Sequence, residues 1–182
     1  MKNKNTTAGY FLVTIIATIF TALIHEFAHW IVSESFGYDT IMTLNRVSTT
    51  SGEHPSELHR YLTTAAGPLI TLIQATLAFW LLKSDKWNKY IYPFLFSAFY
   101  MRLLAGIMNV ININDEGRIS AFLQIGTYTL PAIVSGYLFY LVYKISKKHH
   151  LNWKFQLITT FIVMVVSSIM ILSDQFFDIR LL

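Results

Sequence analysis

The sequence predicts an all-α, polytopic membrane protein with about five transmembrane helices and a short membrane-associated hairpin after the first. Composition is the first reason: 54% of the 182 residues are hydrophobic and only 13% are charged, whereas about a quarter of the residues in soluble domains are charged. Long apolar stretches are the second reason, because roughly 20 helical residues cross a hydrocarbon core of about 30 Å. A backbone in lipid must satisfy its own hydrogen bonds, and these stretches lack strand alternation, so helices are expected.

Five stretches are long enough to cross, near residues 9–35, 62–82, 90–113, 119–145 and 155–172. Between the first two, YDTIMTLNRVSTTSG combines alternation with turn residues, which predicts the hairpin. No internal repeat, low-complexity tract or linker divides the chain. Residues 1–182 are therefore expected to form a single transmembrane domain.

The charge and the cysteine content of the chain limit the partners and the metal ligands that it can have. The net charge is +4 and the basic residues lie in short loops, which is typical of membrane orientation and not of nucleic-acid binding. We therefore expect a multi-pass protein of the cell membrane, with the lipid bilayer as a partner and no nucleic acid. The chain has no cysteine, so any bound metal must be held by imidazole and carboxylate groups.

The first stretch carries three ionisable residues, His25, Glu26 and His29, within IFTALIHEFAHWIV. On a helix, this H-E-x-x-H pattern places both imidazoles on one face, one turn apart, with the glutamate about 100° around from the first. Two nitrogen ligands beside a carboxylate that can accept a proton from water are the parts of a hydrolytic zinc site. Each ionisable group inside a span costs roughly 2.5 to 3.5 kcal/mol, which argues that these residues have a use.

The same helix face continues as a row of threonines. Thr14, Thr18 and Thr21 precede His25 at steps of three and four residues. Such a polar face should lie toward the bundle interior or a water-filled cavity. The alternative is that the histidines lie at the membrane interface and have no specific role.

A catalytic zinc ion commonly has three protein ligands and one open position, so a third ligand is needed. If the second and third stretches both cross, the chain returns to the membrane face of His25 at NVININDEGRIS, and Asp115 is the predicted third ligand. One alternative is that Asp115 or Asn114 only caps the following helix. Another is that the ligand comes from the loop before the second stretch, which contains Glu53, His54, Glu57 and His59.

These motifs resemble those of the site-2 protease family, membrane-embedded zinc metalloproteases that cleave other proteins within or beside the bilayer. HEFAH is similar to the H-E-x-x-H of the family, and AGP at 66–68 is similar to its A-G-P signature. Asp115 and Gly117 in NDEGRI match a later L-D-G motif. The resemblance covers about residues 22–118.

Two features of the chain depart from the family pattern. Glu116 stands where a glycine usually follows the aspartate, and the N-x-x-P element lacks its prolines, with Asn109 and Asn112 in their place. These departures put the shape of the loop before Asp115 in doubt. The resemblance makes an amide of Asn109 or Asn112 a candidate donor to the oxyanion of the tetrahedral intermediate. The alternative is that either asparagine bonds a neighbouring helix.

The resemblance implies that His25, His29 and Asp115 bind zinc and that Glu26 activates the attacking water. It implies an intramembrane zinc endopeptidase whose partners are membrane-anchored protein or peptide substrates. The segment YDTIMTL is a candidate to pair with substrate as an added strand. Arg102, inside the third stretch, is expected either to pair with an acidic group or to bind a substrate carbonyl.

A second function also fits the sequence: a non-proteolytic membrane zinc-binding protein, such as a transporter or an immunity-type protein. Both functions need the two histidines, whereas only hydrolysis needs Glu26 to be unligated and basic.

Overall fold

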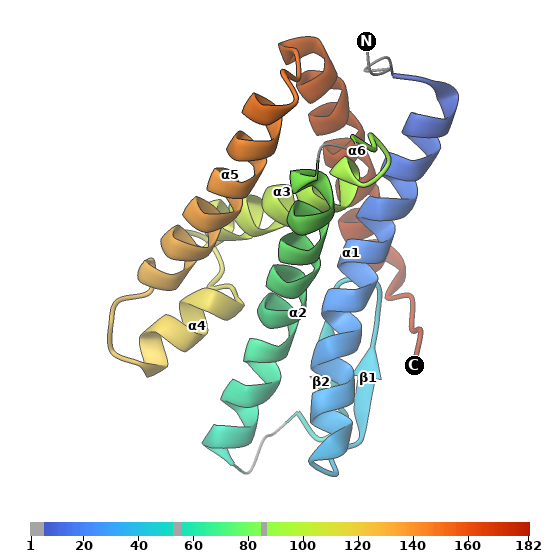
Figure 1. The fold of residues 1–182 in the computed structure, drawn as a ribbon. Coiled ribbons are helices and arrows are strands. Elements are labelled where there is room, and N and C mark those ends of the chain that lie inside the picture. The colour runs from blue at the N-terminus through green and yellow to red at the C-terminus, as the bar shows by residue number, and fades with distance from the viewer. Residues whose placement is uncertain (1–5, 53–55, 85–86) are drawn as a thin grey trace.

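The fold was obtained as a computed structural model that describes residues 6–52, 56–84 and 87–182. Six helices and a two-stranded pair follow one another along this part of the chain (Figure 1). The elements are α1 (Ala8–Ser35), β1 (Thr40–Met42), β2 (Val47–Thr49), α2 (Glu57–Lys83), α3 (Tyr92–Met108), α4 (Asp115–Phe122), α5 (Thr129–Lys148) and α6 (Trp153–Phe177).

The predicted all-α class is confirmed, but five crossing helices are not. Among the described residues, α1, α2 and α6 are long and apolar enough to cross a membrane, while α3 is apolar but has only 17 residues. The stretch predicted at 119–145 is two helices, because α4 ends at Phe122 and a turn follows in which Gly126 has a φ of +86°. Glycine adopts that backbone conformation without steric cost, so it ends the apolar run as a turn.

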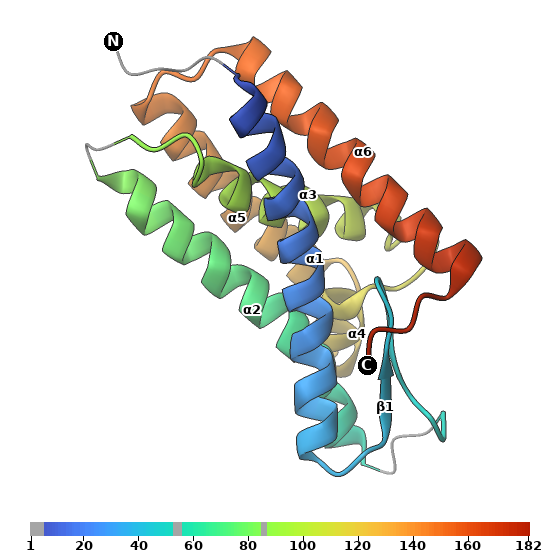
Figure 2. The same cartoon turned by 90° about the vertical axis from the view of Figure 1, so that its right-hand side faces the viewer.

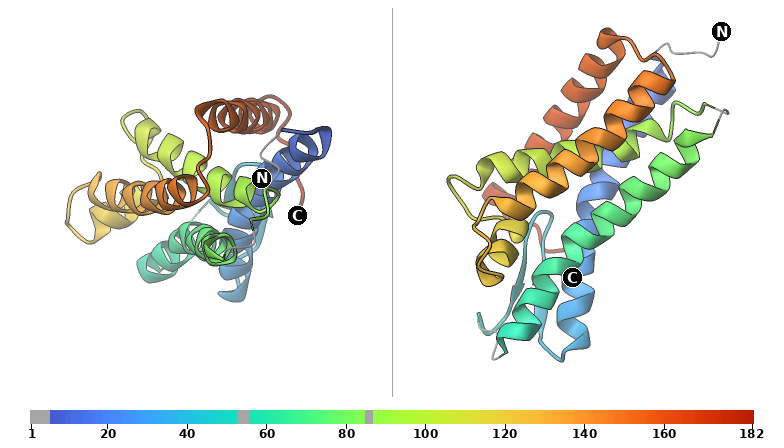
Figure 3. Two further views of the ribbon diagram at one scale, coloured as in Figure 1. Left: turned by 45° about the horizontal axis from the view of Figure 1, so that its top comes forward. Right: turned by 60° about the vertical axis from the view of Figure 1, so that its left-hand side comes forward.

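Helix α1 is the centre of the bundle and packs against α2, α3 and α6 (Figure 2). Helix α3 lies across the long helices at a steep angle, which two further views also show (Figure 3). The core between the helices is made of large apolar side chains with at most 2% exposure, among them Tyr10, Leu82, Tyr92, Leu95, Leu138, Ile145 and Phe155. This crossing of α3 brings the turn after it back to the middle of α1.

The threonine face of α1 is turned inward, as predicted. Thr14, Thr18 and Thr21 are at most 1% exposed, and each hydroxyl donates to the carbonyl four residues before it. Thr18 also lies 3.1 Å from the hydroxyl of Ser97, and the Gln74 amide donates to Thr21 over 2.8 Å. These hydroxyls are satisfied inside the bundle, and they align the face that carries His25.

A two-stranded antiparallel pair follows α1, with Thr40 opposite Thr49 and Met42 opposite Val47. The pair packs against α1: the hydroxyls of Ser33 and Thr40 are 2.8 Å apart, and the Trp30 indole donates to the carbonyl of Thr40. Its association with a membrane remains a prediction.

One buried hydrogen bond joins α1 to α6 and allows a test of this packing. The hydroxyls of Tyr10 and Thr159 are 2.6 Å apart, and Thr159 donates its own proton to the carbonyl of Phe155, so Tyr10 is the donor between them. We expect Tyr10→Phe to lower the free energy of unfolding in detergent by about 1 kcal/mol, because a buried acceptor loses its donor. Tyr128→Phe is the control, since Tyr128 is 52% exposed. Equal losses of unfolding free energy in the two variants would contradict the packing of α1 against α6.

Candidate metal centre

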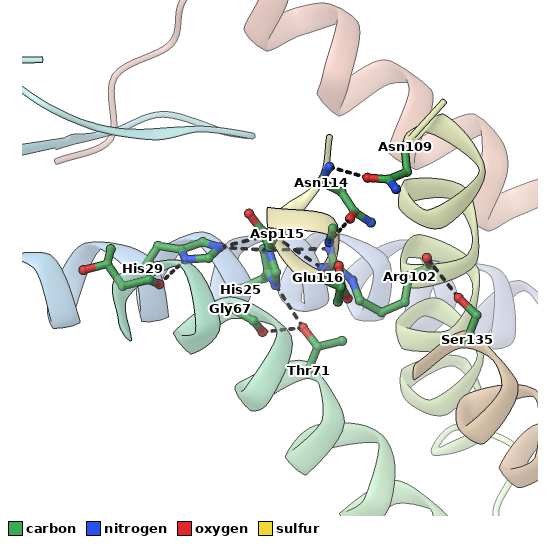
Figure 4. Close-up of polar contacts among 12 residues, drawn as sticks. His25, His29, Gly67, Thr71, Arg102, Asn109, Asn114, Asp115, Glu116 and Ser135 are labelled. Carbon is green, nitrogen blue, oxygen red and sulfur yellow. Dashed lines mark hydrogen bonds and ion pairs between the residues drawn. The ribbon is translucent and has the colours of Figure 1, made fainter. Parts of the chain in front are cut away.

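Three predicted ligands meet at one point, between α1 and the start of α4 (Figure 4). The Nε2 atoms of His25 and His29 are 3.1 Å apart. The Oδ2 atom of Asp115 is 3.2 Å from the first and 3.5 Å from the second. Both histidines are buried, and the Asp115 side chain is 23% exposed. Two imidazoles and one carboxylate are the donor set of many catalytic zinc sites, so these residues can hold a metal ion.

Hydrogen bonds on the far side of each ring fix its orientation. The Nδ1 atom of His29 lies 2.6 Å from the carbonyl oxygen of Thr63 and must carry a proton to donate to it. The Nδ1 atom of His25 lies 3.1 Å from the hydroxyl of Thr71, which already donates to the carbonyl of Gly67 and therefore accepts. Such bonds set the tautomer and leave the lone pair of Nε2 for a metal.

The donor chemistry of the cluster favours a cation. With both Nδ1 atoms protonated, the neutral rings present two acceptor nitrogens to each other and to a carboxylate oxygen at 3.1 to 3.5 Å. Acceptor atoms at such short distances repel one another unless a cation or a proton lies between them. The arrangement thus fits the metal-binding interpretation better than the alternative in which the histidines have no role.

The start of α4 explains why Asp115 is free to act as a ligand. Asn114 is the N-cap residue, and its side-chain oxygen accepts from the amide of Gly117 over 2.7 Å. An N-cap oxygen satisfies a backbone donor that the helix itself leaves unpaired. Capping therefore falls to Asn114, and the carboxylate of Asp115 points at the two imidazoles instead (Figure 4).

Gly67 lets α2 pass directly beside the histidines. A Cβ atom at this position would lie 2.3 Å from Nε2 of His29 and 2.4 Å from Cε1 of His25. Any side chain there would displace the rings. The small residue of the AGP sequence is thus required by the close approach of α2, which also supplies Thr63 and Thr71, four residues before and four after Gly67.

Glu26 lies beside the cluster without belonging to it. Its side chain is 9% exposed, and within the described part of the chain it makes no hydrogen bond or ion pair. Its electrostatic neighbours include His29, Asp115 and Arg102. Glu26 follows His25 directly on α1 but is not one of the three residues whose ligand atoms meet.

Arg102 pairs with acidic groups at the edge of the cluster. Its Nη1 atom is 3.2 Å from Oε1 of Glu116 and 3.7 Å from Oδ2 of Asp115, and its Nη2 atom is 3.5 Å from Nε2 of His25. Arg102 and Glu116 are both buried. The departure from the family pattern at Glu116 thus has a physical reason: it is the counter-charge of a buried arginine, which would be costly if unpaired.

The structure does not bring the two candidate oxyanion donors to the cluster. The Asn109 amide donates to the carbonyl of Thr127 over 3.0 Å, and its oxygen accepts from the backbone amide of Asn114 over 2.9 Å. Figure 4 shows this side chain directed at Asn114. Asn109 therefore bonds neighbouring turns, and it holds the loop that places Asp115. Asn112 is exposed in the same loop and has no described side-chain contact with the histidines.

Two of the four alternative ligands, Glu57 and His59, lie in the first turn of α2 and not in a loop, and neither belongs to the cluster. Glu57 is exposed and pairs with Arg60, and His59 bonds the hydroxyl of Tyr38. The remaining two, Glu53 and His54, are outside the described residues.

The chain matches no protein-family model, no curated protein and no solved structure. The resemblance to site-2 proteases thus rests on the sequence motifs alone. Sequence analysis did not identify the partners on α2, although Thr63, Gly67 and Thr71 follow one another at steps of four residues. That helical spacing is the signal that could have found them.

The close approach at Gly67 yields a matched prediction. We expect Gly67→Ala to abolish high-affinity zinc binding, because the added methyl group overlaps both imidazoles. Gly136→Ala on α5 is the control, because a Cβ atom there meets nothing within 4 Å, and alanine is the better helix former. Zinc stoichiometry and thermal unfolding in detergent would be measured for both. Unchanged zinc binding in Gly67→Ala would contradict the geometry.

The two asparagines give a second matched pair. We expect Asn109→Ala to weaken zinc binding by about 10- to 100-fold, as is typical when a residue that positions a ligand is removed. Asn112→Ala should leave zinc affinity unchanged, because Asn112 is exposed. Competition with a chromogenic chelator measures both affinities. A larger loss of zinc affinity in Asn112→Ala than in Asn109→Ala would show that Asn109 does not position the Asp115 loop.

Proposed function

We propose that the chain is an intramembrane zinc endopeptidase similar to the site-2 proteases, a multi-pass protein of the cell membrane that hydrolyses peptide bonds of membrane-anchored proteins or peptides. One observation carries the proposal: ligand atoms of His25, His29 and Asp115 lie within 4.8 Å of one another, while Glu26, the residue after His25 on α1, is not among them. A metal-storage or structural site has no need of the Glu26 carboxylate.

The apolar surface supports a place in the bilayer. Besides three helices long enough to cross, the outward faces of α2 and α6 carry large apolar side chains, with Leu77 61%, Trp80 72% and Phe161 62% exposed. In water such surface would be an aggregation hazard, whereas lipid solvates it. The ionisable cluster is turned the other way, into the bundle, where polar groups of membrane proteins are commonly functional.

Each residue of the centre has a chemical role in this proposal. When zinc is held by His25, His29 and Asp115, it supplies Lewis acidity toward a carbonyl group and a water molecule. Glu26 accepts the proton of that water as it adds to the scissile carbonyl carbon. The same carboxyl group then gives that proton to the nitrogen as the C–N bond breaks, which yields a carboxylic acid and an amine and returns Glu26 to its carboxylate form.

Arg102 is the donor best placed to stabilise negative charge on the carbonyl oxygen. Its guanidinium is buried within 3.5 Å of Nε2 of His25, and the Glu116 carboxylate holds it there. A preorganised donor of this kind acts on the oxyanion of the transition state without reorganisation. In this proposal Arg102 takes the role that the family resemblance suggested for an asparagine.

Glu26→Gln separates hydrolysis from zinc binding alone. We expect the variant to retain about one zinc per chain and to lose at least about 100-fold in cleavage of a detergent-solubilised single-span reporter protein, since a general base of this kind contributes that much. Glu57→Gln is the control, because Glu57 is exposed and lies outside the cluster. This variant should cleave the reporter like the wild type. Zinc is measured by atomic absorption and cleavage by gel electrophoresis.

The outcomes discriminate between the two candidate functions. Zinc bound by both proteins with cleavage only in the wild type supports the protease. Zinc bound by both with no cleavage by either would favour a non-proteolytic membrane zinc-binding protein, and equal cleavage by both would contradict the role of Glu26 as the general base.

A further inference from the structure

One end of the helix bundle is basic. The lysines that the structure describes all lie there, at the ends of α2 and α5, before α3 and in the first turn of α6: Lys83, Lys89, Lys144, Lys147, Lys148 and Lys154. The ammonium group of Lys148 donates to the carbonyl of Lys83, which joins the ends of α5 and α2. Figure 1 shows the turn between α5 and α6 at the same end as the start of α1, opposite the hairpin. The sequence has no aspartate or glutamate between Glu116 and Asp174, so the lysines of α5 and α6 have no counter-charge within their own helices.

A hollow of about 470 Å³ lies between α5 and the start of α6 at this end. Along α5 its lining changes from the apolar Phe139 and Val142 to Lys147, and the turn and α6 add the polar side chains of His150 and Gln156. The helix rise places Phe139 about 12 Å before Lys147 along α5. The hollow therefore presents apolar groups toward the middle of the bundle and polar groups at its basic end. A phospholipid has its parts in the same order, with acyl chains in the hydrocarbon core and the phosphate at the membrane face.

The ammonium group of Lys147 has an aromatic neighbour but, among the described residues, no acidic partner. Its Nζ atom lies 5.9 Å from the centre of the Tyr143 ring, and Tyr143 is 49% exposed. A cation–π contact at an exposed site is weak, and it leaves the N–H groups of the ammonium able to donate to an anion. Lys144 has the same kind of contact with Tyr140, at 5.3 Å, but does not line the hollow. The two lysines therefore form a matched pair that differs in access to the hollow.

The backbone of His150 is in the left-handed conformation, with a φ of +48°. It follows the last turn of α5, where the amide of His150 donates to the carbonyl of Lys147 and the amide of Leu151 donates to that of Ser146. Glycine is the usual residue at this position of a helix end, because other residues have a steric cost there. Histidine thus accepts a backbone cost that glycine would avoid, and its side chain lines the hollow. Such strained positions are concentrated at functional sites.

We infer that the hollow between α5 and α6 binds an anionic phospholipid of the bilayer. The lipid phosphate accepts hydrogen bonds from Lys147 and His150, since bonds from charged donors to phosphate are strong. The first part of an acyl chain lies against Phe139 and Val142. Basic pockets between transmembrane helices at a membrane face are typical sites for acidic headgroups, whereas a hollow of similar volume between α2 and α5 has no charged side chain in its lining. The site shares no residue with the metal centre, so it is independent of whether the chain hydrolyses peptides.

The test measures lipid binding to the purified full-length chain in a neutral detergent by native mass spectrometry. Dioleoyl phosphatidylglycerol is the anionic probe, and dioleoyl phosphatidylcholine is the zwitterionic probe with the same acyl chains. Lys147→Gln removes the cation that lines the hollow, and Lys144→Gln removes its neighbour outside it. His150→Gly removes the imidazole while the backbone keeps its conformation without steric cost. Glycerol phosphate, which has no acyl chains, is the competitor that distinguishes a lipid site from a site for free phosphate.

We expect the wild type to prefer the anionic lipid, and Lys147→Gln and His150→Gly each to bind it about five- to ten-fold more weakly, because each loses a direct bond to the phosphate. Lys144→Gln should lose at most about two-fold, because a charge outside the hollow acts only through solvent. Equal losses in the two lysine variants would show diffuse attraction to the basic end and would overturn the inference. Equal affinity for the two lipids, or displacement of the anionic lipid by glycerol phosphate, would overturn it too. So would unchanged lipid binding by His150→Gly with a higher unfolding temperature, because the imidazole would then have no contact with the phosphate.

Discussion

The requirement to hold three electron-pair donors at one point inside an apolar bundle governs the centre of this structure. His25, His29 and Asp115 place two nitrogens and an oxygen within 3.5 Å of one another, an arrangement that repulsion would open unless the surrounding residues fix it. The outer bonds of the rings to α2 set their tautomers, and Gly67 brings α2 close enough to make them. The cluster is thus a product of α1 and α2 packing as much as of its own residues.

Charge compensation around the cluster is shared between Arg102 and Glu116. Their buried pairing, at 3.2 Å, is the shortest ion pair of Arg102, whose guanidinium also lies 3.7 Å from the carboxylate of Asp115 and 3.5 Å from Nε2 of His25. Burying either partner alone would be strongly unfavourable, so the two residues depend on each other. Glu116 at the start of α4 and Arg102 inside α3 are therefore one feature of the chain.

The hairpin links the metal centre to the last helix. Strand β1 packs on α1 through Ser33 and Thr40, and the turn after it bonds Asp174 of α6. A single short strand thus borders α1, β2 and residues 180–182 at once.

Local spacing in the sequence was enough to predict which residues share a helix face. The histidines of H-E-x-x-H share a face because residues four apart on a helix are neighbours, and the inward direction of the threonine face follows from the same periodicity. Placing Asp115 near them assumed that the second and third stretches both cross, whereas in the structure the steep course of α3 brings the turn before α4 back to α1. These predictions needed no knowledge of side-chain packing, because helix geometry and chain direction carry them.

Only the tertiary structure decided which residues support the cluster. The pairing of Arg102 with Glu116, the role of Asn109 in holding the Asp115 loop, and the pairing of residues 180–182 with β1 join segments whose mutual approach depends on how helices cross. The apolar run at 119–145 divides because its turn forms where α4 and α5 pack, and hydropathy alone does not register such a turn. Local periodicity fixes which face a residue lies on, whereas the neighbour across that face is set by packing between elements distant in the chain.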